Sequence, residues 1–154
     1  MPWMQAAVDK PFGFRPYGRI RNISGYRKGS DASAIYPGDV VVLSSDGQID
    51  PATTAGPTNI IGVAAEYSAA STAKSDFLVY DDPEQTFYVQ DDSDTTNMTE
   101  SSVGNNVNLV TTTGDTSTLQ SLMEIDSSTA ATTSTLAMKV IQLHPVENYS
   151  YASA

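Results

Sequence analysis

The clearest structural signal in the chain lies in residues 36–49, which read Tyr36-Pro37-Gly38-Asp39-Val40-Val41-Val42-Leu43-Ser44-Ser45-Asp46-Gly47-Gln48-Ile49. A turn sequence leads into an uninterrupted run of β-favouring residues, Val40 to Leu43, which is typical of a buried strand. The dipeptide Asp46-Gly47 then indicates a tight hairpin turn, and a return strand begins at Gln48-Ile49. These residues predict an antiparallel β-hairpin.

Similar apolar runs recur on the C-terminal side of this hairpin, with turn residues between them. They lie at residues 59–64, 77–80, 86–90, 107–110, 119–125 and 136–143. The intervening stretch 91–106 is polar and irregular, with one short helical turn expected at 98–103. No segment carries an apolar stripe of helical period. The sequence therefore predicts an all-β fold, a small antiparallel β-sandwich or barrel.

Length and composition limit the classes of protein that fit. A chain of 154 residues predicts one domain with its own core. The absence of cysteine excludes a disulfide scaffold and thiol catalysis. No apolar run is long enough to span a bilayer. We expect an extended N-terminal arm at residues 1–33, a β-rich body at 34–146 and a C-terminal tail at 147–154.

Charge is distributed unevenly along the chain, whose net charge is −10. Six of the eight basic residues precede residue 29, where Asp9 is the only acid, so this part carries +5. The remaining two basic and 17 acidic residues give the rest of the chain −15. A basic segment of this kind often meets an acidic partner, whereas the acidic body should repel nucleic acid and anionic membranes. We expect neither as a partner.

The arm is rich in large apolar side chains although prolines and glycines interrupt it. A merely disordered tail would be poor in aromatic residues. Two interpretations stay open at this point. The aromatic residues bind a partner, or they cover one end of the core of the body.

No constellation of residues points clearly to catalysis. The single histidine, His144, has no nucleophile elbow of the Gly-x-Ser-x-Gly type to serve, and a structural or surface role is expected for it. The acidic segment from Asp92 to Glu100 has part of a calcium-loop pattern but lacks the glycine of its sharp turn. A solvated acidic loop is the default interpretation, and no cofactor or metal is expected.

Several stretches resemble the small capsid decoration (cement) proteins of tailed bacteriophages. The resemblance covers most of the chain, in order and with similar spacing, and departs from the family pattern at residues 147–151. The matching stretches are Pro11–Pro16, Tyr36–Val41, Ile60–Val63, Phe77–Pro83, Met123–Ala130 and Leu136–Leu143.

The resemblance implies a non-enzymatic structural protein on the outer surface of the phage head. In that role it binds the major capsid protein and cements adjacent capsid subunits against internal pressure. A dimer or trimer on local symmetry axes is expected, because closed symmetric contacts suit a symmetric lattice. The alternative is a head-fibre or glycan-binding, host-surface-binding module, which would use Tyr67, Tyr80, Tyr88 or Tyr149.

Aromatic and arginine side chains dominate the binding energy of protein interfaces, so the arm provides the candidate contact residues. In the competing interpretation, Phe12, Phe14 and Tyr17 pack on the body and the arginines neutralise its carboxylates. The predicted capsid-contact residues are Trp3, Phe12, Phe14, Arg15, Tyr17, Arg19, Ile20, Arg21, Tyr26 and Arg27.

Overall fold

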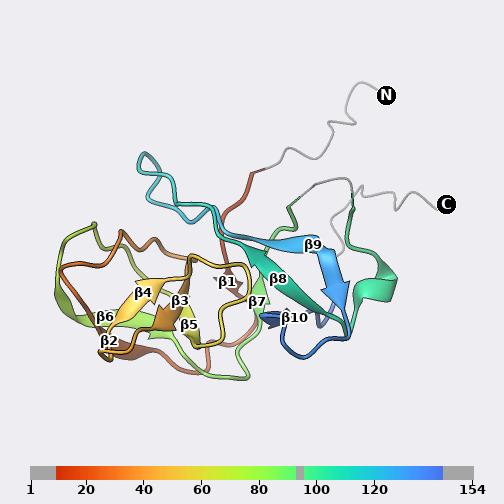
Figure 1. The fold of residues 1–154 in the computed structure, drawn as a ribbon, viewed down its shortest axis with the longest axis horizontal. Coiled ribbons are helices and arrows are strands. Elements are labelled where there is room, and N and C mark those ends of the chain that lie inside the picture. Colours follow the sequence, from red (N-terminus) through yellow and green to blue (C-terminus); the bar gives the residue numbers. More distant parts are fainter. Residues whose placement is uncertain (1–9, 93–95, 144–154) are drawn as a thin grey trace.

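A computed structural model describes residues 10–92 and 96–143. Trp3, His144, Tyr149 and the tail 147–154 lie outside the described residues. The fold is all-β, as the sequence predicts, with one 3-10 helix, η1 (Glu100–Ser102), near the expected helical turn (Figure 1). The strands are β1 (Arg15–Pro16), β2 (Ser24–Lys28), β3 (Val40–Leu43), β4 (Ile49–Pro51), β5 (Ile60–Ala64), β6 (Lys74–Tyr80), β7 (Phe87–Tyr88), β8 (Asn106–Val110), β9 (Glu124–Ala131) and β10 (Met138–Lys139).

Five strands close into a barrel in the order β2-β4-β3-β5-β6. The predicted hairpin is present as β3 and β4, which pair antiparallel with Val42 opposite Asp50. The barrel is mixed rather than purely antiparallel, because β2 and β4 run parallel where Lys28 lies opposite Ile49. Closing the sheet brings together two strands that are not joined by a turn, so no hairpin rule fixes their relative direction.

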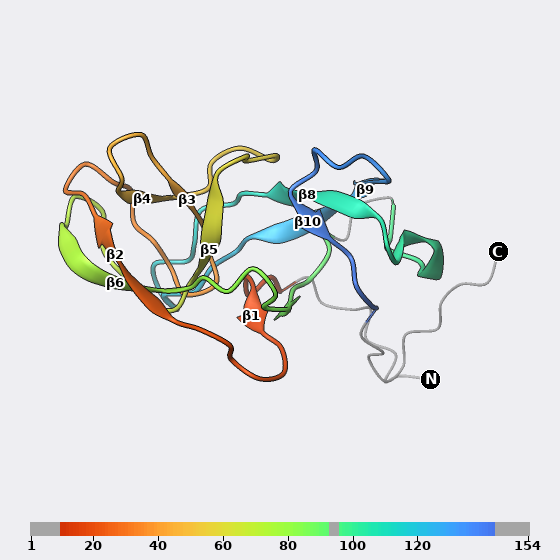
Figure 2. The same ribbon diagram turned by 90° about the horizontal axis from the view of Figure 1, so that it is seen from below.

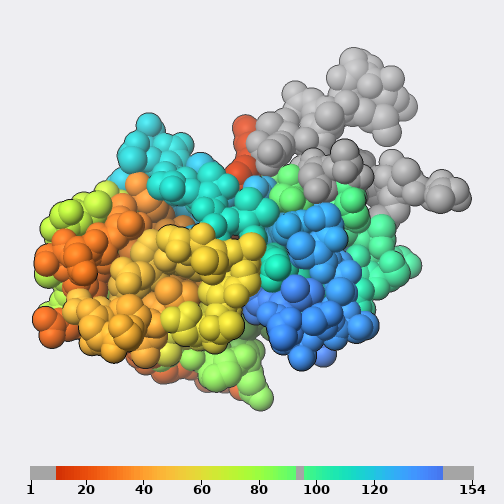
Figure 3. All heavy atoms as spheres, in the orientation of Figure 1, coloured from red at the N-terminus to blue at the C-terminus, as the bar shows by residue number. Residues whose placement is uncertain are grey.

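A second sheet, in the order β10-β8-β9, packs beside the barrel. In the space-filling view the barrel (orange to yellow) and this sheet (blue) form one continuous body (Figure 3). One cluster of buried residues joins barrel strands to the second sheet, and it includes Val40, Val63 and Leu109. Another fills the barrel, with Val41 and Phe77 among its members. Strand β3 is therefore buried on both faces, which explains its uninterrupted apolar run.

Much of the predicted arm is part of the body, which differs from the expected extended segment ending at residue 33. Strand β1 pairs with β7, and β2 is a barrel strand that pairs with β6. Phe14 is only 3% exposed and belongs to the cluster between the barrel and the second sheet. The physical reason is closure: without β2, strands β4 and β6 would each expose a row of unpaired backbone groups.

Two predicted strands have different bounds in the structure. The strand expected at 119–125 begins only at Glu124, because residues 111–122 form a loop that extends away from the sheet (Figure 1). The strand expected at 136–143 is limited to β10, although Val140 still exchanges backbone hydrogen bonds with Gly104 and Asn105. In both places an apolar pattern extends beyond the paired residues.

Candidate functional site

The connection between β1 and β2, residues 17–23, exposes three large apolar side chains. Tyr17 is 53% exposed, Ile20 48% and Ile23 41%. Figure 2 shows this connection running along the lower edge of the molecule, from β1 to β2. Isolated exposed apolar residues are ordinary, but a group of them on one short connection marks a possible contact surface. We call residues 17–23 the β1–β2 loop.

Both ends of the β1–β2 loop are fixed to the segment before β7. The backbone N–H of Tyr17 donates to the carbonyl oxygen of Thr86 at 2.9 Å. The backbone N–H of Arg21 donates to Oε1 of Gln85 at 3.0 Å. The loop thus has a defined conformation before it meets any partner.

Acidic residues that follow β6 form intramolecular contacts with two of the predicted contact residues. Arg21 donates from Nη2 to Glu84 at 2.6 Å, and its Nε lies 3.5 Å from Asp82. The hydroxyl of Tyr26 donates to Oδ2 of Asp81 at 2.7 Å. Burial, together with the hydrogen bond and negative charge of Asp81, raises the pKa of Tyr26 to about 12. For Arg21 and Tyr26 the structure therefore has the intramolecular arrangement that the competing interpretation describes.

An aromatic stack holds Arg15 at the surface of β1. The ring of Phe12 stacks on Tyr88 with centroids 5.4 Å apart and an interplanar angle of 18°. The guanidinium carbon of Arg15 lies 4.7 Å from the centroid of the Phe12 ring. Within residues 10–92 and 96–143, no carboxylate lies at ion-pair distance from Arg15. The guanidinium is fixed in direction by the ring and exposed to a partner.

The other predicted contact residues differ in their surroundings. Phe14 is buried and packs edge-to-face on Phe87, with centroids 6.4 Å apart. Arg19 is exposed on the β1–β2 loop, and Arg27 is exposed on β2 near Lys74, at the end of the barrel away from β1. Trp3 lies outside the described residues. Phe12 and Arg15 therefore lie together at β1, and Tyr17, Arg19 and Ile20 lie on the loop that follows β1.

Sequence reasoning missed two features of this region. Leu78 is exposed on the outer face of β6, opposite Gly25 of β2, and it alternates with the buried Phe77 and Val79. That period of two is visible in the sequence and could have identified it. Lys28 is buried, and its ammonium group donates to the carbonyl oxygens of Ala69 and Thr72 at 2.9 Å each. No sequence signal indicates that this lysine faces inward.

The tyrosines of the alternative function pack against other rings. Tyr67 lies against Tyr36 with centroids 5.3 Å apart, and Tyr80 lies edge-on to Phe87 at 6.4 Å. Tyr88 is covered by Phe12. These half-buried rings pack on one another, and no flat, open aromatic platform for a sugar is formed by the three that the structure describes.

In the acidic loop considered for calcium, Asp92 uses its carboxylate for internal hydrogen bonds. Oδ1 of Asp92 accepts from the backbone N–H of Ser127 at 3.2 Å and from its hydroxyl at 3.0 Å. Asp94 lies outside the described residues. In the part of the chain that the structure describes, no three acidic or histidine side chains gather to hold a metal ion. Nor do the described residues include a helix with the length and apolarity needed to cross a membrane.

Comparisons of the chain with family models, with curated proteins and with solved structures found no match. The functional interpretation therefore rests on the residues and contacts described above and on the resemblance of the sequence stretches.

Proposed function

We propose that this protein is a non-enzymatic structural protein that binds the outer surface of an assembled phage head. In this role it contacts adjacent subunits of the major capsid protein and cements them against internal pressure. The observation that carries the proposal is the β1–β2 loop, which presents Tyr17, Arg19 and Ile20 beside the Arg15 stack. The family resemblance supplies the kind of partner.

The fixed ends of the β1–β2 loop favour tight attachment. An extended arm would lose about 1–2 kcal/mol of backbone entropy for each residue that it orders on binding. Here folding has already fixed the loop through Thr86 and Gln85, so less of that entropy is lost on the capsid. Burial of Tyr17, Ile20 and Ile23 then contributes to binding against a smaller loss of backbone entropy.

Charge supports an outward-facing position of the molecule. The basic residues of β1 and the β1–β2 loop can face carboxylates of a capsid subunit, while the acidic remainder of the chain faces solvent. Like-charged outer surfaces would keep neighbouring particles apart. A dimer or trimer on a local symmetry axis would attach by several loops at once and gain avidity without new contacts. Mass photometry of the free protein tests the oligomeric state.

A matched pair of variants tests the function. Ile20 and Val103 have similar exposure, 48% and 44%, but Ile20 lies on the β1–β2 loop and Val103 ends η1. We expect Ile20→Asp to weaken co-sedimentation with expanded heads of the cognate phage at least tenfold, because it places a charge in an apolar contact. Val103→Asp should bind as the wild type does. Equal binding by both variants would contradict the assignment of this surface, and no binding by the wild type would contradict the function.

A further inference from the structure

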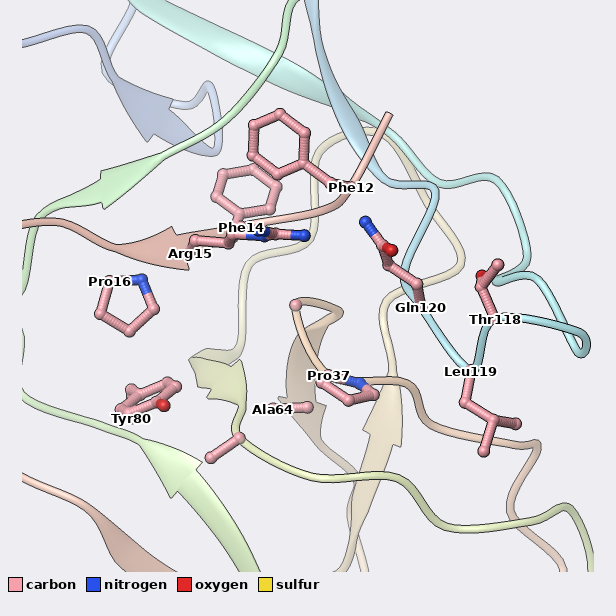
Figure 4. A pocket seen from close by; sticks show the side chains of 12 residues that line it. Phe12, Phe14, Arg15, Pro16, Pro37, Ala64, Tyr80, Thr118, Leu119 and Gln120 are labelled. Atoms are coloured by element: carbon pink, nitrogen blue, oxygen red, sulfur yellow. The ribbon is translucent and has the colours of Figure 1, made fainter. Parts of the chain in front are cut away.

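A cavity of about 290 Å³ opens beside the Arg15 stack (Figure 4). Its walls come from three places in the chain: β1 with the residues before it, the end of the barrel at Pro37 and Ala64, and the loop residues 118–120. Figure 4 shows the side chain of Arg15 pointing across this space toward Gln120. Pockets for small organic ligands usually have volumes of about 300–1,000 Å³, so this cavity has room for little more than one or two protein side chains.

Charge indicates what such a side chain would carry. Arg15 is the only ionised group in the described wall, and no aspartate or glutamate lines the cavity. The Phe12 ring lies 4.7 Å from the guanidinium carbon, and a guanidinium can form the two parallel hydrogen bonds of an arginine–carboxylate pair. The cavity is complementary to an acidic side chain.

Much of the remaining wall is apolar, and its backbone N–H groups at the end of the barrel are already hydrogen-bonded. The backbone N–H groups of Gly38, Ala64 and Ala65 each donate within the protein, and the wall includes Pro16 and Pro37, which have no N–H. An added β-strand would need such donors, so strand addition is disfavoured at these positions. Contact must come through side chains, with Tyr80 providing an apolar floor.

The loop side of the cavity carries an exposed and conformationally unusual residue. Leu119 is 43% exposed and has a φ of +52°, in the left-handed region that a branched side chain rarely adopts. The backbone of Asp115 exchanges hydrogen bonds with that of Gln120, which closes the turn that contains Leu119. Strained residues of this kind concentrate at binding sites, where the surrounding structure holds them in place. Leu119 is thus placed to pack against whatever enters the cavity.

We propose that this cavity binds an acidic side chain of the major capsid protein, an aspartate or glutamate next to an apolar residue in a surface loop. The carboxylate pairs with Arg15, and the apolar neighbour packs between Leu119 and Tyr80. The inference rests on the proposed function and adds a second contact to the β1–β2 loop. In this contact each capsid subunit contributes an aspartate or glutamate side chain.

Crosslinking in the full chain tests the proposal, with the expanded heads of the cognate phage as the probe. A benzophenone amino acid is placed at Thr118, which lines the cavity, and separately at Ile20 on the β1–β2 loop. Arg15→Glu is compared with Lys139→Glu, a reversal at an exposed lysine of β10 that is not among the predicted contact residues. Both variants should melt within a few degrees of the wild type, because neither basic side chain forms an ion pair among the described residues.

We expect the Thr118 probe to label a capsid segment that contains an acid. Arg15→Glu should lose at least tenfold in affinity, and Lys139→Glu should change less than twofold. Reversal of the labelled acid to arginine should restore binding of Arg15→Glu. The inference is overturned, and the proposed function kept, if Ile20 crosslinks while Thr118 does not and Arg15→Glu binds normally. If the wild type fails to bind heads, both are overturned.

Discussion

The substitution Phe14→Ala tests whether Phe14 is a core residue or a residue that is kept for binding a partner. Phe14 is 3% exposed, packs edge-to-face on Phe87 and belongs to the cluster that joins the barrel to the second sheet. Truncating a buried phenylalanine costs about 3–5 kcal/mol. For a chain of this length, each kcal/mol lowers the melting temperature by about 2–4 °C, so we expect a fall of roughly 10 °C.

The matched control is the next residue, Arg15→Ala. Its guanidinium is exposed on the Phe12 ring, where such a contact is worth about 0.5–1 kcal/mol, so its melting temperature should fall by only about 2–3 °C. Thermal unfolding followed by circular dichroism, together with urea titration, measures both changes. If Phe14→Ala melts within about 2 °C of the wild type, residues 12–16 are not part of the core and their placement here is wrong.

Two further predictions concern glycine and alkaline pH. Gly13 and Gly18 share a φ of +73°, but a Cβ at Gly13 would lie 2.4 Å from the Cβ of Ser121, whereas one at Gly18 meets nothing within 4 Å. Gly13→Ala should therefore lower the free energy of unfolding by several kcal/mol and Gly18→Ala by about 1–2 kcal/mol, and equal losses in urea titrations would contradict the close packing. The raised pKa of Tyr26 means that the folded protein keeps this proton better than the unfolded chain does, so stability is lost as pH rises from about 10 to 12. Tyr26→Phe should show a shallower loss between about pH 10 and pH 12, and identical slopes would refute the raised pKa of Tyr26.

The sequence predicted a strand correctly where an apolar run matches a buried segment and turn residues flank it. Strand β3 was predictable because its valine run is bounded by Pro37-Gly38 and Asp46-Gly47, and both of its faces are buried. Strand β2, Ser24–Lys28, has no comparable pattern, since its most buried residue is a lysine and Gly25 carries no side chain. Its conformation is imposed by pairing with β6 during barrel closure, which propensity alone does not indicate.

The sequence predicted which residue types form the candidate site, but it did not predict which of these residues face inward and which are exposed. The arginines and aromatic residues that are enriched before residue 29 include those of the Arg15 stack and of the β1–β2 loop. Which residues face inward depends on β7 and the segment after β6, about 60 residues away in the sequence. The contribution of Leu119 had no signal at all, because it depends on a turn that brings residues 118–120 against β1.

The basic residues before residue 29 differ in whether they present their charge to a partner. Arg21 is paired with Glu84 at the surface, so its charge is offset locally, and the ammonium group of Lys28 is enclosed by two carbonyl groups, so its charge does not reach an outside surface. Arg15 and Arg19, like Arg27, are exposed without an ion pair among the described residues. A uniform basic arm would attract any acidic surface, whereas two arginines at fixed positions beside apolar side chains select a surface with matching geometry. Folding the basic segment into the body thus reduces its net attraction and increases its specificity, which would suit the proposed attachment to one kind of site on a repeating shell.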